Sequence, residues 1–144
     1  MTIHDSQQLA HASVEWALDK KAEDVVLLDL RGLLDVTDWF VIATGFSEIQ
    51  VQAIADGVVD RAMEAGQKPA HVEGRRTGRW VLIDFIDVGV HVMLPQERDR
   101  YRLDRLWGDA GLIAFDESGE SRVVREGVAP ETPTLSDSDD AADR

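Results

Sequence analysis

Residues 80–94 read WVLIDFIDVGVHVML, and this stretch decides how the chain folds. Two apolar runs, residues 79–86 and 89–94, are separated by Asp87 and Val88, a spacing typical of an antiparallel hairpin. Side chains alternate along a strand, so the two faces of this hairpin carry different residues. One face would carry only apolar side chains: Val81, Ile83, Phe85, Val90, Val92 and Leu94.

The second face of the hairpin is mixed in character. It carries Trp80, Leu82, Asp84, His91 and Met93. A two-residue turn would place Asp84 directly opposite His91. Either a helix of the same domain covers this face, with Asp84 and His91 as an internal hydrogen-bonded pair, or the face belongs to a docking patch that Tyr101 and Trp107 extend. Protein interfaces are enriched in Trp, Tyr and Met, so both interpretations stay open.

The segments around the hairpin predict alternating helices and strands. Asp5 with Gln8, and Ser47 with Gln50, have the spacing of helix-capping residues, so helices are expected at 5–22 and 47–65. Three further extended segments and a last short helix are expected at 24–30, 39–44, 70–73 and 103–107. This order predicts an α/β (α+β) fold, in which a mixed five-stranded sheet is flanked by helices.

Composition divides the 144 residues into a folded domain, 1–115, and an acidic disordered tail, 116–144. The formal net charge of −13 disfavours binding to a phosphate backbone and favours a basic protein surface as partner. The chain has no cysteine, no basic, apolar leader and no apolar run of about 18 residues. We therefore expect a cytoplasmic protein that does not enter a membrane.

Catalytic motifs are missing from the sequence, which predicts that the chain is not an enzyme and needs no cofactor. His71, Glu73 and His91 would make a metal site only if they met, and a solvated strand edge explains the first two equally well. Ser47 at a helix start is explained as an N-cap without any bound phosphate. Arg75, Arg76 and Arg79 lie close together in one loop, which is either a solvated turn or a contact with RNA phosphates at the rim of a larger complex.

Five colinear motifs between Asp24 and Ala110 resemble those of the ribosomal silencing factors, the RsfS or Iojap family. They are DVTDWFVIATG (35–45), QVQAIAD (50–56), HVEG (71–74), WVLIDF with DVGVH (80–91), and Arg98, Tyr101 and Leu103 followed by LWGDA (106–110). Gly89 departs from the family pattern, where a β-branched residue is common, and is expected to loosen its strand.

The resemblance implies a nucleotidyltransferase-like core without catalytic acids. It also implies binding to the large ribosomal subunit through its protein number fourteen, where the small subunit joins, so that translation falls under nutrient limitation. Homodimers of the free protein are implied as well. Partner-binding residues are then expected at Trp80, Asp84, His91, Tyr101, Leu106 and Trp107, with His71 and Glu73 as a second group.

Two other functions compete with this expectation. A residual nucleotidyltransferase would use Ser47, Asp84 and Asp87 to hold a nucleotide and Mg²⁺. A plain dimerisation module would pair the hairpin face with its own copy and ignore ribosomes. Calorimetry with a nucleotide and sedimentation with ribosomal subunits separate the three.

Overall fold

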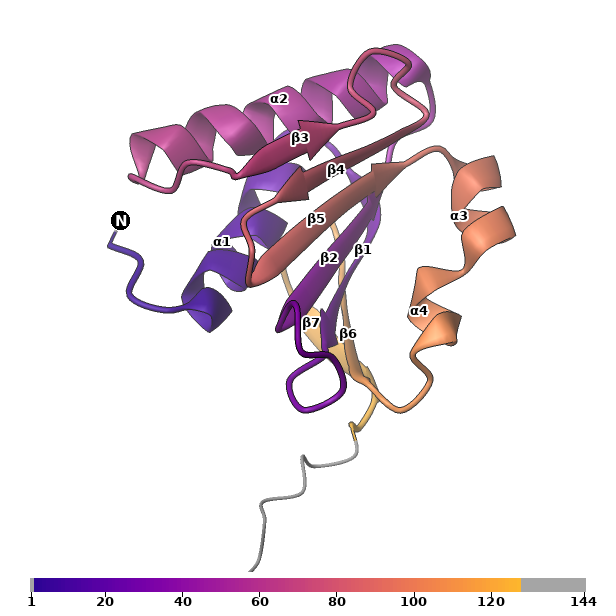
Figure 1. Cartoon of the computed structure of the whole chain (residues 1–144). Coiled ribbons are helices and arrows are strands. Elements are labelled where there is room, and N and C mark those ends of the chain that lie inside the picture. Colours follow the sequence, from indigo (N-terminus) through magenta and orange to yellow (C-terminus); the bar gives the residue numbers. More distant parts are fainter. Residues whose placement is uncertain (1, 128–144) are drawn as a thin grey trace, which may run out of the picture.

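A computed structural model describes residues 2–127 of the chain (Figure 1). Its helices are α1 (Ser6–Asp19), α2 (Glu48–Glu64), α3 (Pro95–Tyr101) and α4 (Leu103–Leu106). Its strands are β1 (Glu23–Asp29), β2 (Trp39–Thr44), β3 (His71–Glu73), β4 (Trp80–Asp84), β5 (Val88–Met93), β6 (Gly111–Phe115) and β7 (Ser121–Arg125). None of the helices within these residues has the length and apolar character needed to cross a membrane.

The strands form one sheet in the order β3-β4-β5-β2-β1-β6-β7. Only β2 and β5 run parallel among these pairs, which confirms the mixed sheet. The predicted number of five strands is wrong, because β6 and β7 extend the sheet beyond β1. The folded part therefore continues past Phe115 to Arg125, whereas residues 128–144 of the predicted tail lie outside the described residues.

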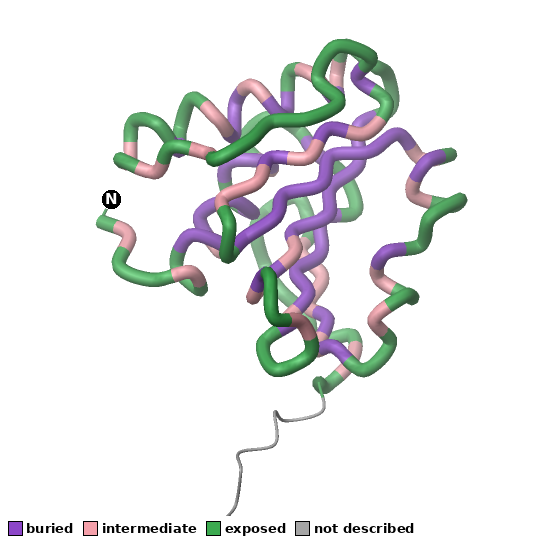
Figure 2. Tube along the Cα trace, viewed as in Figure 1, coloured by how far each residue is buried: buried purple, intermediate pink, exposed green. Residues whose placement is uncertain are grey.

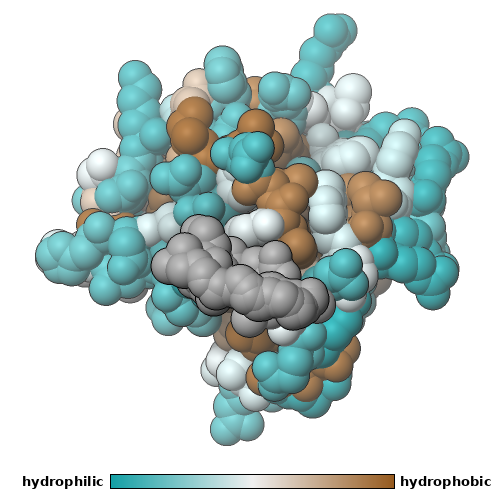
Figure 3. All heavy atoms as spheres, turned by 60° about the horizontal axis from the view of Figure 1, so that its bottom comes forward, coloured by the Kyte–Doolittle hydropathy of each residue, from teal (hydrophilic) through white to brown (hydrophobic). Residues whose placement is uncertain are grey.

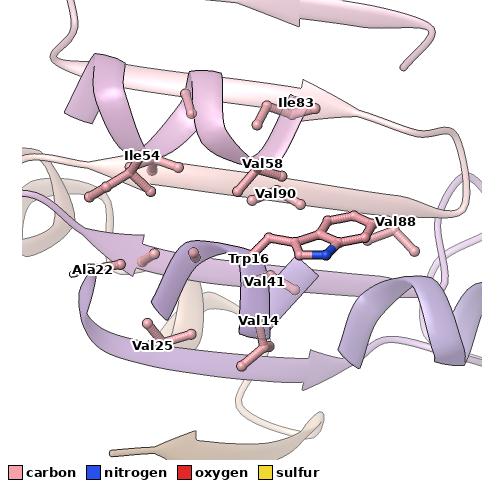
Figure 4. Close-up of a cluster of buried hydrophobic side chains, with 14 of the residues drawn as sticks. Val14, Trp16, Ala22, Val25, Val41, Ile54, Val58, Ile83, Val88 and Val90 are labelled. Atoms are coloured by element: carbon pink, nitrogen blue, oxygen red, sulfur yellow. The ribbon is translucent and has the colours of Figure 1, made fainter. Parts of the chain in front are cut away.

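Helices cover the two faces of the sheet unequally. On the α1–α2 face, the two long helices pack together and against β1, β2, β4 and β5 (Figure 1). A largely aliphatic cluster lies between them and the strands, and the Trp16 indole extends toward Val88 within it (Figure 4). On the α3–α4 face, Leu103 of α4 joins a smaller cluster with Leu28, Ile42 and Met93. The sheet is thus the middle of three layers.

Both predicted helix starts are confirmed by hydrogen bonds. The Asp5 carboxylate accepts from the Gln8 amide at 2.8 Å, and the Ser47 hydroxyl accepts from the Gln50 amide at 3.0 Å. These side chains satisfy amide groups that have no partner inside the first turn of a helix. α1 ends at Asp19 rather than at 22, because Lys21 turns the chain with a φ of 68°.

The β4–β5 hairpin has a different register from the predicted one. Asp84 lies opposite Gly89, and Leu82 lies opposite His91. The predicted position of the two-residue turn is wrong: the Phe85 amide donates to the Val88 carbonyl, so Ile86, at φ 75°, and Asp87 form the turn in place of Asp87 and Val88. This shift of the turn by one residue moves every cross-strand pair and leaves Asp84 away from His91. The expected Asp84–His91 pair therefore does not form.

Candidate docking site

The α3–α4 face is left open along β3 and β4, at the edge of the sheet. Figure 2 shows β3 exposed and β4 alternating between buried and half-buried residues, beside the buried β5. Tyr101, whose ring packs on Trp80 of β4, is 46% exposed, and Leu106 at the end of α4 is 66% exposed. We define the docking face as six side chains from β3, β4 and the α3–α4 segment: Glu73, Trp80, Leu82, Tyr101, Leu106 and Trp107.

A row of five rings connects the two ends of the docking face. Tyr101 lies 4.8 Å from Trp80 between ring centroids, and Trp80 lies 5.8 Å from His91. Phe40 then contacts His91 at 4.5 Å and Trp107 at 5.2 Å, both edge to face. Edge-to-face packing fixes ring orientation as well as burying area. The structure therefore brings together four of the predicted residues, and it adds Phe40, which the sequence treated only as part of a buried strand.

His91 is the buried centre of this row, with 6% of its surface exposed. Its Nδ1 atom accepts a hydrogen bond from the Trp80 indole Nε1–H at 3.0 Å, so the imidazole proton lies on Nε2. Burial lowers the pKa of His91 to about 4, which keeps the imidazole neutral at physiological pH. Its burial does not suit direct contact with a partner; His91 orients Trp80 from beneath.

Gly89 makes room for one ring of this row, and the expected loosening of its strand stays a prediction. A Cβ atom at this position would lie 3.1 Å from Cε1 of Phe40, closer than ordinary contact. The strand is continuous through Gly89, which lies opposite both Phe40 and Asp84. The glycine therefore makes room for the Phe40 ring between His91 and Trp107.

α3 is held over the sheet by two charged side chains, and this placement fixes Tyr101. The Arg98 guanidinium donates to the backbone carbonyl of Asp24 and, at 2.8 Å, to the Thr44 hydroxyl. Its burial lowers the pKa of Arg98. The buried carboxylate of Glu97 lies 3.7 Å from Nε of Arg79. Arg98 therefore has a structural role: it attaches α3 to the sheet.

The remaining predicted contacts are spread along the sheet edge. Glu73 lines a hollow of about 280 Å³ with Gly74, Trp80 and Leu82, so it borders the docking face. Asp84 and His71 pair across the strands at the other end of β4. The Asp84 carboxylate accepts from the Ile86 amide at 2.8 Å, which assigns it to the turn. Of the second group, Glu73 lies nearer to the aromatic rings than His71 does.

The three loop arginines have different surroundings. Arg75 forms two hydrogen bonds to the Asp56 carboxylate, at 2.9 and 2.7 Å, and this contact raises its pKa. Arg79 faces Glu97, as described above. Arg76 is exposed and has no ionic partner within residues 2–127. Of the three loop arginines, Arg76 is therefore the one whose guanidinium has no ionic partner among the described residues.

The residues of the competing catalytic arrangement do not meet. Ser47 follows the end of β2 that pairs with Met93, whereas Asp84 and Asp87 lie at the opposite end of β5. A six-residue strand separates these ends by roughly 17 Å. In the described part of the chain, no cluster of three or more His, Cys, Asp or Glu residues could hold a metal ion. His71 and Glu73 lie on exposed β3, while His91 is buried.

The surface at one end of the molecule mixes hydrophilic and hydrophobic side chains (Figure 3). Figure 3 brings forward the end of the molecule that lies at the bottom of Figure 1, and hydrophobic side chains emerge there in small groups among hydrophilic ones. Isolated exposed apolar residues are normal on soluble domains. The docking face differs because its aromatic side chains form a connected row.

Comparison with known proteins gives one consistent result. Residues 3–143 match the family described as RsfS, ribosomal silencing factor during starvation. The ribosomal silencing factor RsfS of Bacillus subtilis is 48% identical over 98 residues, which cover 68% of this chain and 83% of that protein. A mouse protein named mitochondrial assembly of ribosomal large subunit protein 1 is 29% identical over 68% of this chain and 43% of its own length.

A solved structure has a similar fold. The crystal structure of a Chromobacterium violaceum protein superposes with a TM-score of 0.71 and 34% sequence identity. The match covers 88% of this chain and 98% of that one. The similarity therefore extends over nearly all of the solved chain, including its mixed arrangement of helices and strands.

Proposed function

The chain belongs to the family of ribosomal silencing factors, and on that premise we propose that it docks on the large ribosomal subunit and lowers translation when nutrients are limiting. The docking face is the observation that supports this role, because an aromatic row ends there in exposed Tyr101 and in Trp107, which follows exposed Leu106. Such side chains are the usual anchors of protein interfaces.

The proposed partner is the large-subunit ribosomal protein number fourteen, at the face where the small subunit joins. Trp80, Tyr101 and Leu106 would bury apolar surface against it, and Glu73, Asp104 and Asp109 would orient a basic partner. The net charge of −13 supports fast approach to such a surface. Arg76, at the rim, is the residue available for a peripheral contact with ribosomal RNA.

Silencing would be steric and would need no chemical step. A folded domain seated on the joining face occupies volume that the small subunit requires, so the two bodies exclude each other. This mechanism requires only that the protein bind the subunit tightly and remain rigid, and the packed aromatic row would supply both properties. It also implies that the protein acts in the cytoplasm, where the subunits meet.

The same face supports a homodimer of the free protein. Tyr101 and Leu106 are exposed in the single chain, and pairing with a second copy would cover them. A dimer made in this way must open before the ribosome is bound. Dimerisation and subunit binding would then compete for one surface.

Sedimentation through a sucrose gradient tests the proposal. We expect the protein to migrate with isolated large subunits, and addition of small subunits to yield fewer joined ribosomes. The double variant Trp80→Ala with Tyr101→Ala should weaken co-migration by about thirtyfold or more, because each change removes an aromatic anchor that the partner would bury. Phe46→Ala is the matched control, since this aromatic side chain is 60% exposed and lies at the β2–α2 connection.

Circular dichroism must show that the double variant is folded. Co-migration as strong as that of the unaltered chain would overturn the docking face. Unchanged subunit joining in the presence of bound protein would overturn the steric mechanism.

A further inference from the structure

The helix that carries Leu106 is too short to be stable by itself. α4 has four residues, Leu103–Leu106, and isolated helices of this length are unstable in water. It begins after Arg102, which has a φ of 48°, and it has no side-chain cap at its start. Leu103 is its buried residue, while Leu106 points to solvent. Some other group must therefore fix the position of Leu106.

Arg125 of β7 supplies three hydrogen bonds to this segment. Its Nε donates to the Ala110 carbonyl at 2.7 Å. Its Nη2 donates to the carbonyls of Asp104 at 3.1 Å and Trp107 at 3.0 Å. The carbonyls at the end of a helix lack partners within the helix, and a guanidinium satisfies them while countering their partial negative charge. One side chain thus binds α4 and the following turn at three points.

A β-bulge directs Arg125 toward α4. Val123 pairs with Ile113, but Arg125 pairs with Leu112, so Val124 is an extra residue in β7. Leu112 belongs to the cluster on the α3–α4 face, whereas Ile113 packs toward α1 and α2. In a regular register Arg125 would share the face of Val123 and point away from α4. Bulges commonly re-aim one side chain in this way.

We propose that Arg125 is a positioning residue for the docking face: the β6–β7 hairpin carries it to the end of α4, where its guanidinium holds Leu106 and Trp107 in place for the partner. The proposal rests on the proposed function, because it concerns the same surface. It assigns a binding role to a segment that the sequence alone placed in a disordered tail.

Arg125→Ala tests this role in the full chain, with Arg122→Ala as the matched control. Arg122 lies on the same strand and the same face but is exposed and makes no side-chain hydrogen bond within residues 2–127. We expect Arg125→Ala to weaken co-migration with purified bacterial large subunits about tenfold, the size of one coupling between contacting residues. Arg122→Ala should leave binding within about twofold of the unaltered chain.

Hydrogen exchange separates positioning from general destabilisation. In Arg125→Ala the amides of Leu106 and Ala110, which bond to Arg102 and Trp107, should exchange faster. The amides of β4 and β5 should keep their protection. Faster exchange throughout the sheet would instead assign Arg125 to global stability and overturn the proposal.

Leu106→Ala completes the test, alone and combined with Arg125→Ala. If Arg125 acts through Leu106, the arginine change should cost little once Leu106 is absent. Weak binding by Leu106→Ala with normal binding by Arg125→Ala would overturn the inference but keep the docking face. Normal binding by Leu106→Ala would show that α4 takes no part in docking, and the inference would fail with it.

Arg125→Lys replaces Arg125→Ala in the same binding measurement if the alanine variant does not fold. Lysine retains the charge but lacks the planar fork that reaches three carbonyls at once. We expect it to bind with intermediate strength. Binding equal to that of arginine would contradict the proposed geometry.

Discussion

The two faces of the β4–β5 hairpin contain residues that alternate along the same two strands, yet the faces differ in burial and in role. On the α1–α2 face, Val81, Ile83, Val90 and Val92 are fully buried beneath two long helices. On the α3–α4 face, Trp80 and Leu82 are only half-buried, and Trp80 packs on Tyr101 of the short α3. The first face forms part of the hydrophobic core, and the second leaves apolar surface available to a partner.

The two faces also differ in the chemical type of their side chains. The covered face of the hairpin is aliphatic, with branched side chains that pack densely between sheet and helices. The other face contains aromatic rings and a buried imidazole. Rings that pack against one another fix their mutual orientation. The difference indicates that the second face is built for position and contact more than for stability.

The adjacent residues Ile83 and Leu82 give the sharpest test of this comparison. Ile83→Ala should lower the free energy of unfolding by about 3 to 4 kcal/mol, because it empties a site in a closed core. Leu82→Ala should cost about 1 kcal/mol, since Leu82 is half-buried, but it should weaken binding to the large subunit. Urea unfolding and sedimentation measure the two quantities.

The folded Ile83→Ala protein should bind the subunit as the unaltered chain does. Equal losses of stability at the two positions would remove the distinction between the faces. So would a Leu82→Ala protein that binds normally.

Acidification should act mainly through the α3–α4 face. Burial lowers the pKa of His91 from 6.5 to about 4, so the unfolded chain takes up this proton before the folded chain does. Stability should therefore fall as the pH drops from 6.5 to 4, by about 3 kcal/mol from this residue, with no further loss from it below pH 4. Protonation of Nδ1 would also break the hydrogen bond from Trp80.

His91→Asn isolates that contribution. Asparagine keeps an acceptor near the position of Nδ1 but does not titrate, and all other ionisable groups are unchanged. Urea unfolding at pH 7 and pH 4.5 should show a smaller pH-dependent loss in the variant than in the unaltered chain. Equal losses would mean that His91 is not the neutral, buried partner of Trp80.

The α1–α2 face was largely predictable from the sequence. The run WFVIAT gave β2 its observed bounds, and the capping pairs at Asp5 and Ser47 located both long helices. These signals are local, because a strand pattern or a cap involves residues a few positions apart. The buried face of the hairpin followed from simple alternation.

The α3–α4 face was less predictable because it depends on distant contacts. The turn at Ile86 set the register, so His91 met Trp80 instead of Asp84. The exposed β7 lacks strong apolar alternation, and its polar surroundings suggested disorder. Arg125 could not be recognised without the bulge that turns it toward α4. Strand alternation predicted which hairpin side chains share this face, but not how they pair across the strands.

The smallest expected effect concerns the turn that joins the two strands, and it separates stability from binding. Ile86 is 58% exposed and has a φ of 75°, a conformation that disfavours β-branched residues and suits glycine. Ile86→Gly should raise the free energy of unfolding by roughly 1 kcal/mol, because relief of strain exceeds the entropy that glycine adds to the unfolded chain. The turn lies at the end of β4 away from Trp80, so binding to the large subunit should not change. Urea unfolding and sedimentation test both statements. A stabilised variant with altered binding would show that overall stability, rather than the docking face, controls the interaction.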